Sequence, residues 1–400
     1  MRAALVLIHR YGGLAMAPFL IIAGLTGSVL VFMPELDAWL NPELYTVREA
    51  AVARSLTSLV SEIETRRPEL EVAAVLMPAR ADRSLSMFVQ PKAGYPPLKD
   101  DQLFVDPATG QILGERYYAA FRMDTAHILP FLRRVHYSLY IPGVFGIWLM
   151  GVVALIWTAD CFVGFALTLP RARPFWRKWR PIWRMKRGAG RFRFNLDIHR
   201  ASGLWLWPAL FLVALSSVAL NLPDQVFRPV LSMLLPTSPE IWEQPSIRLP
   251  PDATIGFGEA VAIAERTAEQ RVWTQKPAAI FLLRDRGQYL VSFNGNRQAG
   301  LGASSLLLDA ADGGIVHIDE AGAGKAGDIV AGLMLPIHTG DVVGLPGRIL
   351  VCLTGLVVAL LSITGVYVWW KKRVPRLMRR RMMAATSRPS ARIGEVHAAE

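Results

Sequence analysis

Four long apolar runs and two long polar segments alternate along the 400-residue chain. A helix needs about 20 mostly apolar residues to cross a hydrocarbon core about 30 Å thick. The four runs are long enough, at residues 7–34, 140–169, 198–222 and 342–370. The pattern predicts a multi-pass membrane protein with four spans, and its two polar segments lie in water.

The two polar segments show the same order of predicted elements. In the first, apolar spacing predicts a helix over 53–66, alternation predicts a strand around Met87, and 104–114 reads as a hairpin. In the second, a helix is predicted over 258–270, strands over 279–283 and 289–293, and a hairpin over 308–316. Both segments are therefore expected to be α+β.

The membrane segments are also repeated. Residues 9–18 read HRYGGLAMAP and residues 199–208 read HRASGLWLWP, 190 positions apart, and the Pro-Gly pairs at 142–143 and 346–347 match 204 positions apart. Both halves cross the bilayer in the same direction, so an axis along the membrane normal should relate them. The expected fold class is a membrane all-α four-helix bundle, a tandem duplication of helix pairs, with two α+β domains.

Four histidines fall at equivalent membrane edges of the two halves. The axis predicts that His9 faces His199 at one edge and that His136 faces His338 at the other. Ionisable groups at membrane depth are costly and by default suggest function. Two facing imidazoles suit six-coordinate haem iron, held in a helix bundle from both sides of the ring. All four are predicted axial ligands of two haems.

Neighbouring residues fit this interpretation. Gly13 and Gly203, one helical turn from His9 and His199, would make room for a macrocycle. Several arginines could donate to haem propionates, although each could equally extend its charged group to the interface. These are Arg10, Arg200, Arg133, Arg134 and Arg348.

Other interpretations of the histidines remain open. They could be ordinary boundary residues, or they could bind zinc or copper, but a pair of imidazoles would leave such an ion under-coordinated. His127 has no counterpart in the second half and is expected to be solvated or structural. Asp160 is expected to pair with a loop arginine or to relay protons. His317 and His397 suggest no partner.

The net charge of +12 is concentrated beside the membrane runs. Residues 171–193 hold ten Lys or Arg and no acid, interleaved with Trp176, Trp179 and Trp183, and a second basic run follows residue 370. Nucleic-acid binding is one explanation, but the positive-inside rule explains both runs better. Both termini and the 170–196 loop are expected in the cytoplasm, with the lipid bilayer and no nucleic acid as partner. Cys161 and Cys352 lie in apolar runs and are expected to be buried apolar residues.

Three stretches carry a resemblance to a known family. HRYGG at 9–13, FVDPATGQILG at 104–114 and LSITGVYVWWKK at 361–372 resemble the PepSY-associated transmembrane proteins. This is the iron-regulated membrane family that includes inner-membrane ferric-siderophore reductases. The resemblance covers residues from about 5 to 375.

The resemblance implies a multi-pass protein of the bacterial inner membrane with PepSY-like periplasmic domains. It also implies two bis-histidine haem b groups on His9, His199, His136 and His338. Electrons from a cytoplasmic donor, for example a flavoprotein, would reduce iron(III) in a siderophore. The implied order is helix 1 (1–34), domain 1 (35–135), helix 2 (136–169), basic loop (170–196), helix 3 (197–222), domain 2 (223–337), helix 4 (338–370) and tail (371–400).

Two alternatives concern the role of the whole chain. The chain has no dinucleotide-binding fingerprint, so its reductant must come from elsewhere. Quinol is a second candidate donor. In the other alternative the protein holds no haem, and its PepSY domains bind or regulate a peptidase or another envelope partner.

Overall fold

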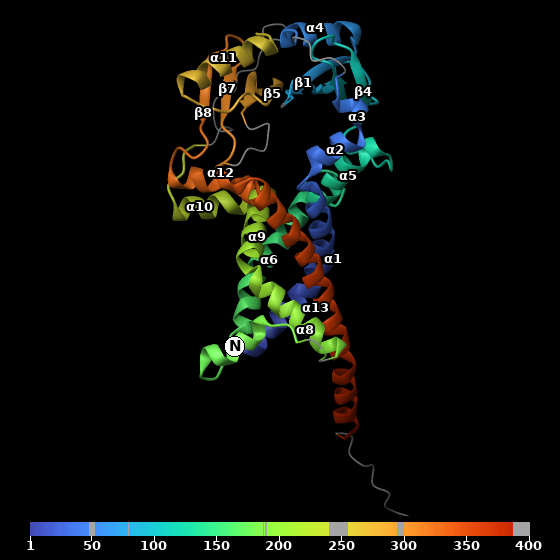
Figure 1. The fold of residues 1–400 in the computed structure, drawn as a ribbon, viewed down its shortest axis with the longest axis vertical. Coiled ribbons are helices and arrows are strands. Elements are labelled where there is room, and N and C mark those ends of the chain that lie inside the picture. The colour runs from blue at the N-terminus through green and yellow to red at the C-terminus, as the bar shows by residue number, and fades with distance from the viewer. Residues whose placement is uncertain are drawn as a thin grey trace, which may run out of the picture.

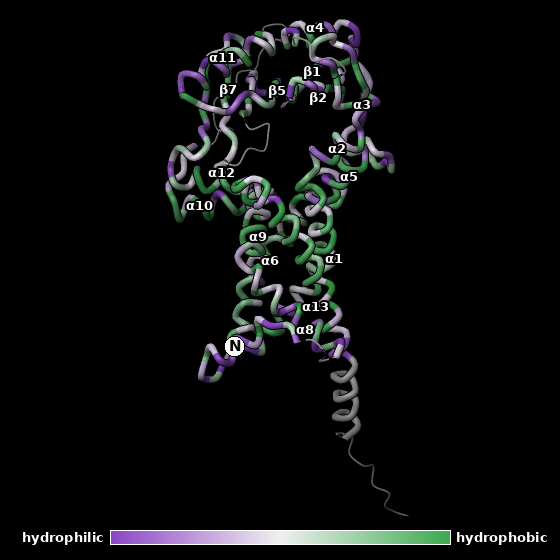
Figure 2. The backbone as a smooth tube through the Cα atoms, in the orientation of Figure 1, coloured by the Kyte–Doolittle hydropathy of each residue, from purple (hydrophilic) through white to green (hydrophobic). Residues whose placement is uncertain are grey.

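The computed structural model describes residues 1–47, 53–78, 80–186, 188, 190–239, 255–293 and 300–386, with side chains to Arg373. A stalk of long helices carries a head built on a β-sheet (Figure 1). The stalk consists of α1 (Arg2–Leu30), α6 (Phe145–Thr168), α8 (Arg191–Trp205), α9 (Trp207–Asn221) and α13 (Leu345–Thr386). Figure 2 shows that the stalk is mostly apolar and that the head and the opposite end of the stalk are more polar. Arg187 and His397 lie outside the described residues.

Three helices in the described part are long and apolar enough to cross a membrane, namely Arg2–Leu30, Phe145–Thr168 and Leu345–Arg373. The fourth predicted run forms α8 and α9, which meet at an angle of 71°. The break falls at Leu206, two residues before Pro208, whose missing N–H removes one hydrogen bond from a continuous helix and so favours the break. The 198–222 run is therefore a bent pair of helices, where a single straight span was expected.

The head contains one antiparallel sheet of eight strands in the order β4-β3-β2-β1-β5-β6-β7-β8. The strands are β1 (Leu70–Leu76), β2 (Leu85–Pro91), β3 (Gln102–Val105), β4 (Ile112–Arg116), β5 (Ala279–Leu283), β6 (Gln288–Ser292), β7 (Ser305–Asp309) and β8 (Ile315–Asp319). Each half of the chain supplies four consecutive strands. The halves join where β1 pairs with β5, with Val75 opposite Ile280.

The predicted fold class is wrong. A membrane all-α four-helix bundle with two α+β domains does not describe a chain whose halves share one eight-stranded sheet. Helices α4 (Leu56–Arg66) and α11 (Phe257–Gln270) lie on one face of that sheet and bury Ile63 and Ala264 in a single core (Figure 1). An open edge on β1 or β5 would expose unpaired N–H and C=O groups, and their pairing removes both edges.

Local predictions in the head are confirmed. The helix expected over 53–66 is α4, the one expected over 258–270 is α11, and the strand expected over 279–283 is β5. The two hairpins have turns of the same geometry. Asp106 and Asp309 each accept a hydrogen bond from the backbone N–H two residues later at 2.8 Å, and the glycine four positions on has a φ of +76°.

Short helices connect the sheet to the stalk. They are α2 (Met33–Leu40), α3 (Pro42–Tyr45), α5 (Thr125–Ser138), η2 (Pro223–Phe227), α10 (Arg228–Leu234), α12 (Ala326–Thr339) and η5 (Asp341–Val343), and the turn η4 (Arg284–Arg286) joins β5 to β6. Helices α5 and α12 carry the second pair of predicted histidines. Each ends in a left-handed residue, at Leu139 and Gly340, that turns the chain into the next long helix.

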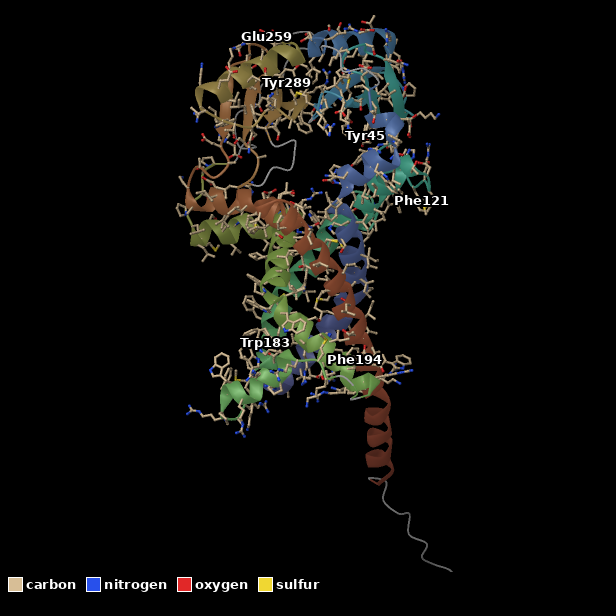
Figure 3. All side chains as sticks on the ribbon, viewed as in Figure 1. Tyr45, Phe121, Trp183, Phe194, Glu259 and Tyr289 are labelled. Carbon is tan, nitrogen blue, oxygen red and sulfur yellow. The ribbon has the colours of Figure 1, made fainter. Side chains whose placement is uncertain are left out.

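At its other end the stalk carries α7 (Phe175–Trp179) and η1 (Arg180–Trp183). Trp179 lies between Trp176 and Trp183, with ring centroids 5.4 and 5.3 Å away. Figure 3 shows Trp183 here, far from the sheet. This end, with Lys371, Lys372 and Arg373, is called the basic end, and the opposite end of the stalk is called the sheet end.

Candidate functional site

The structure brings the four predicted histidines together as two pairs. His9 of α1 and His199 of α8 form the basic-end pair, with ring centroids 6.0 Å apart and ring planes at 61°. His136 of α5 and His338 of α12 form the sheet-end pair, with centroids 6.1 Å apart and planes at 59°. The two pairs thus have nearly the same geometry.

In the basic-end pair each Nδ1 has an acceptor on the exit helix of its own half. His9 Nδ1 lies 2.9 Å from both carboxylate oxygens of Asp160 on α6. His199 Nδ1 lies 3.1 Å from the Leu361 carbonyl and 3.1 Å from the Thr364 hydroxyl on α13. Carboxylates and carbonyls only accept, so both Nδ1 atoms carry the proton and donate.

In the sheet-end pair each Nδ1 meets a hydroxyl. His136 Nδ1 lies 3.0 Å from Thr26 Oγ1, and His338 Nδ1 lies 3.1 Å from Ser216 Oγ. Both hydroxyls give their own proton to a backbone carbonyl of the preceding turn. Each hydroxyl must then accept from the imidazole, which places the proton on Nδ1 again.

All four imidazoles therefore present Nε2 as the free nitrogen. None of these Nε2 atoms makes a hydrogen bond to another residue within the described part of the chain. A neutral imidazole with its Nδ1–H held by an acceptor is the form that binds metals, and the acceptor fixes the orientation of the ring.

The ring spacing fits one metal between two imidazoles. A metal–nitrogen bond of about 2.0 Å, plus about 1.1 Å from nitrogen to ring centre, puts two opposed rings about 6.2 Å apart. The centroid distances are 6.0 and 6.1 Å. No described His, Cys, Asp and Glu side chains gather in groups of three or more that could hold a metal. Each pair supplies two imidazoles, the number that a six-coordinate haem iron takes from the protein.

Helical glycines pack against three of the four imidazoles. A Cβ added to Gly164 would lie 3.5 Å from His9 Cε1, one added to Gly365 would lie 3.3 Å from His199 Cε1, and one at Gly27 would lie 2.8 Å from His136 Cε1. Beside the basic-end pair, a Cβ at Gly13 would meet nothing within 4 Å, and one at Gly203 would meet only a methyl group of Leu361. Protein atoms therefore do not crowd these two glycines, and the macrocycle expected beside them stays a prediction.

The arginines predicted to bind propionates differ in their contacts. Within the described part, Arg10 lies over the Tyr11 ring at 5.9 Å, and neither Arg10 nor Arg200 makes an ion pair or hydrogen bond. Both are therefore available beside the basic-end pair. Arg348 instead donates to the Val31 carbonyl at 2.9 Å and pairs with Glu35 at 2.6 Å. These contacts give it a structural role at the C-terminal end of α1.

Arg133 and Arg134 flank His136 but contact tyrosines. Arg133 donates to the Tyr118 hydroxyl at 2.8 Å, and Arg134 lies over the Tyr140 ring at 5.5 Å. Both line a pocket of about 340 Å³ between α5 and the sheet, together with Tyr117 and Tyr137. They are therefore placed to meet a ligand in this pocket.

Three other predictions concern single residues. His127 is 6% exposed and its Nδ1 lies 2.6 Å from Asp124, so its role is structural and it is not solvated. Asp160 pairs with His9, where a loop arginine was expected. His317 lies on β8, and Cys161 and Cys352 are free and half-buried in the stalk.

The acceptors at the four Nδ1 atoms were not predicted, although the repeat contains their signal. Thr26 and Ser216 are 190 positions apart, the same offset that relates His9 to His199. Asp160 and Thr364 are 204 positions apart, the offset of the exit helices. Each offset therefore links an acceptor to its counterpart in the other half, but it does not by itself identify either residue as an acceptor.

Comparison with known proteins supports the membrane architecture. No curated protein is significantly similar to the chain. The family described as the PepSY-associated TM region, however, matches residues 6–372. This match covers nearly the whole chain and includes both histidine pairs. The chain is therefore a multi-pass membrane protein that belongs to the PepSY-associated TM family.

Proposed function

We propose that the protein is a haem b oxidoreductase of the bacterial inner membrane that reduces ferric siderophores. Electrons enter at the basic end from a cytoplasmic donor and leave at the sheet end, in the periplasm. Reduction of siderophore-bound iron(III) to iron(II) releases the metal for uptake. The positive-inside rule supports the orientation, because the basic runs lie at the end of the stalk away from the head.

One observation carries the proposal. Two pairs of imidazoles, each with a free Nε2 and a ring spacing that fits one metal ion, lie at opposite ends of an apolar stalk. Thr26, which contacts the sheet-end pair, follows His9 by seventeen positions of one helix, or about 26 Å. The two pairs together therefore extend across most of a hydrocarbon core about 30 Å thick.

The residues of each site have separate tasks. Haem b, when bound, supplies an iron that gains and loses one electron. The histidines would hold it through Nε2, while the acceptors at Nδ1 keep each ring in place. Arg10 and Arg200 would donate to propionates at the basic end. Buried apolar side chains between the pairs, including Met16, Leu20 and Val358, keep water out of the stalk.

The pocket on α5 is the best-placed site for the acceptor. Its lining includes Arg133 and Tyr137, which lie three residues before and one residue after His136 on α5. Arg133, Arg134 and the tyrosines suit an anionic or aromatic iron chelate. Burial raises the pKa of the Asp101 carboxyl in the same pocket, so its negative charge is less favoured there.

An optical spectrum of the purified protein tests the proposal. We expect sharp bands of reduced bis-histidine haem b, with two haems for each chain. His199→Ala and His338→Ala should each remove about half of the signal, because each destroys one pair. A folded but colourless protein would contradict the proposal and favour a haem-free membrane anchor for the head. In a protein that does show these bands, stopped-flow reduction with flavin or with quinol would identify the class of donor.

Glycine substitutions give a sharper test of the sheet-end site. In Gly27→Ala the new Cβ would come within 2.8 Å of His136 Cε1, so the imidazole must move. We expect haem content to fall from about two to about one for each chain, with the basic-end site retained. Gly164→Ala is the matched control, since its Cβ would make an ordinary 3.5 Å contact with His9. Full haem content in Gly27→Ala would show that haem binding does not depend on the close packing of His136 against α1.

A further inference from the structure

One of the four Nδ1 acceptors differs from its counterpart in the other half. Thr26 and Ser216 are both hydroxyls, and they hold His136 and His338 at 3.0 and 3.1 Å. At the basic end, the repeat counterparts are Asp160 and Thr364. Of the four paired histidines, only His9 has a carboxylate as the acceptor of its Nδ1 proton, so the two halves differ chemically at this acceptor position.

The Asp160 carboxylate is directed at His9 alone. Its side chain is only 11% exposed, and both of its oxygens lie 2.9 Å from His9 Nδ1. Within the described part of the chain it makes no other hydrogen bond or ion pair. The nearby Arg2 guanidinium donates to the Leu167 and Leu169 carbonyls at the end of α6. No described Lys or Arg forms an ion pair with Asp160.

A carboxylate at Nδ1 changes the properties of the ligand nitrogen. The carboxylate attracts the Nδ1 proton and so increases the electron density on the imidazole. Nε2 is therefore a stronger electron donor to the metal than it would be with a hydroxyl at Nδ1. A stronger donor favours iron(III) over iron(II) and so lowers the reduction potential. The negative charge, held in a medium of low dielectric constant, acts in the same direction. The hydroxyl and carbonyl acceptors of the other three histidines act more weakly.

We infer that Asp160 is a positioning residue that makes the basic-end site the more strongly reducing of the two. Electron transfer from the basic-end site to the sheet-end site then lowers the free energy. Transfer through the duplicated stalk is therefore favoured in this one direction. This inference rests on the proposed function, because it requires haem at both pairs. Beyond the proposed function, one side chain, Asp160, determines which of the two sites has the lower reduction potential.

Chains with a single haem site provide the first test. His136→Ala with His338→Ala leaves only the basic-end site, and His9→Ala with His199→Ala leaves only the sheet-end site. Redox titration followed by absorbance should give a lower midpoint potential for the basic-end site. Equal potentials, or a lower potential at the sheet end, would overturn the inference. Absence of haem from both chains and from the unmodified protein would instead reject the proposed function.

Substitution of Asp160 provides the second test, in the chain that retains only the basic-end site. Asp160→Thr reproduces the residue of the second half. It should raise the midpoint potential by the equivalent of at least a tenfold change in the oxidised-to-reduced ratio, about 59 mV for one electron. Asp160→Glu keeps a carboxylate and should have a midpoint potential close to that of the same chain with Asp160. Thr364→Val is the matched control at His199, where the Leu361 carbonyl remains, and a much smaller change is expected.

The outcomes separate a structural from an electronic role. If Asp160→Thr binds haem and its potential is unchanged, the inference is wrong. If that variant binds no haem, Asp160→Asn replaces it, because the amide keeps the shape of the side chain and an acceptor oxygen but has no charge. An unchanged midpoint potential in Asp160→Asn would likewise contradict the inference. A potential raised equally by Thr364→Val would also contradict the inference, since it would remove the special role of the carboxylate.

Discussion

Electron transfer across the bilayer is expected to stop when the sheet-end pair is removed. Under the proposed function, His136→Ala with His338→Ala leaves a basic-end site that a donor at that end should still reduce. Transfer to a ferric chelate on the far side should fall by at least about a hundredfold, because protein side chains do not replace a redox cofactor. The remaining route would cross about 26 Å of protein, the length of α1 between His9 and Thr26.

Proteoliposomes allow this measurement. The vesicles contain a reductant, and the basic end faces their interior. An anionic iron(III) chelate is added outside, and the iron(II) formed is measured with a ligand whose iron(II) complex is coloured. His317→Ala is the matched control, because this histidine lies on β8 and belongs to neither pair. Its rate should equal that of the unmodified protein. Undiminished transfer without the sheet-end pair would show that electrons do not pass through His136 and His338.

The histidine pairs could be predicted from the sequence because duplication carries spatial information. His9 and His199 are 190 positions apart, and His136 and His338 are 202 positions apart, close to the 204-position offset of the exit helices, so an axis between the halves is expected to bring each pair together. The structure adds what an offset does not give, namely the ring spacing and the identity of the four acceptors. Acceptor residues such as Thr26 are common in apolar helices, so residue type alone does not distinguish them.

The joined sheet could not be inferred from the sequence. Alternation predicts strands one at a time, and the pairing of β1 with β5 connects residues about 200 positions apart. The bend between α8 and α9 did leave a signal in Pro208, but the apolar run continues through it and predicts one span. Local patterns thus identified elements correctly, while long-range pairing and helix direction depended on the folded chain.

A second large effect is expected where the head meets the stalk, at a buried ion pair. Arg116 of β4 and Asp37 of α2 are 1% and 2% exposed, and Arg116 Nη2 lies 2.9 Å from Asp37 Oδ2. Arg116 also donates to the Ala126 carbonyl of α5, the helix that carries His136. Tyr45 donates to Asp37 at 2.6 Å, and burial raises the pKa of its hydroxyl, which keeps that proton in place. Figure 3 shows Tyr45 at this junction.

Removal of one partner should destabilise this junction strongly. Asp37→Leu leaves the Arg116 guanidinium buried and uncompensated, and we expect the free energy of unfolding of the head to fall by about 3–5 kcal/mol. Asp37→Leu with Arg116→Met should lose less, because no buried charge is left without a partner. Denaturation followed by circular dichroism measures both. Arg80→Ala is the control, since the Arg80–Asp82 pair is exposed to solvent and should contribute little to the free energy of unfolding. If the double variant were less stable than Asp37→Leu, the ion pair would not be what makes the single change costly.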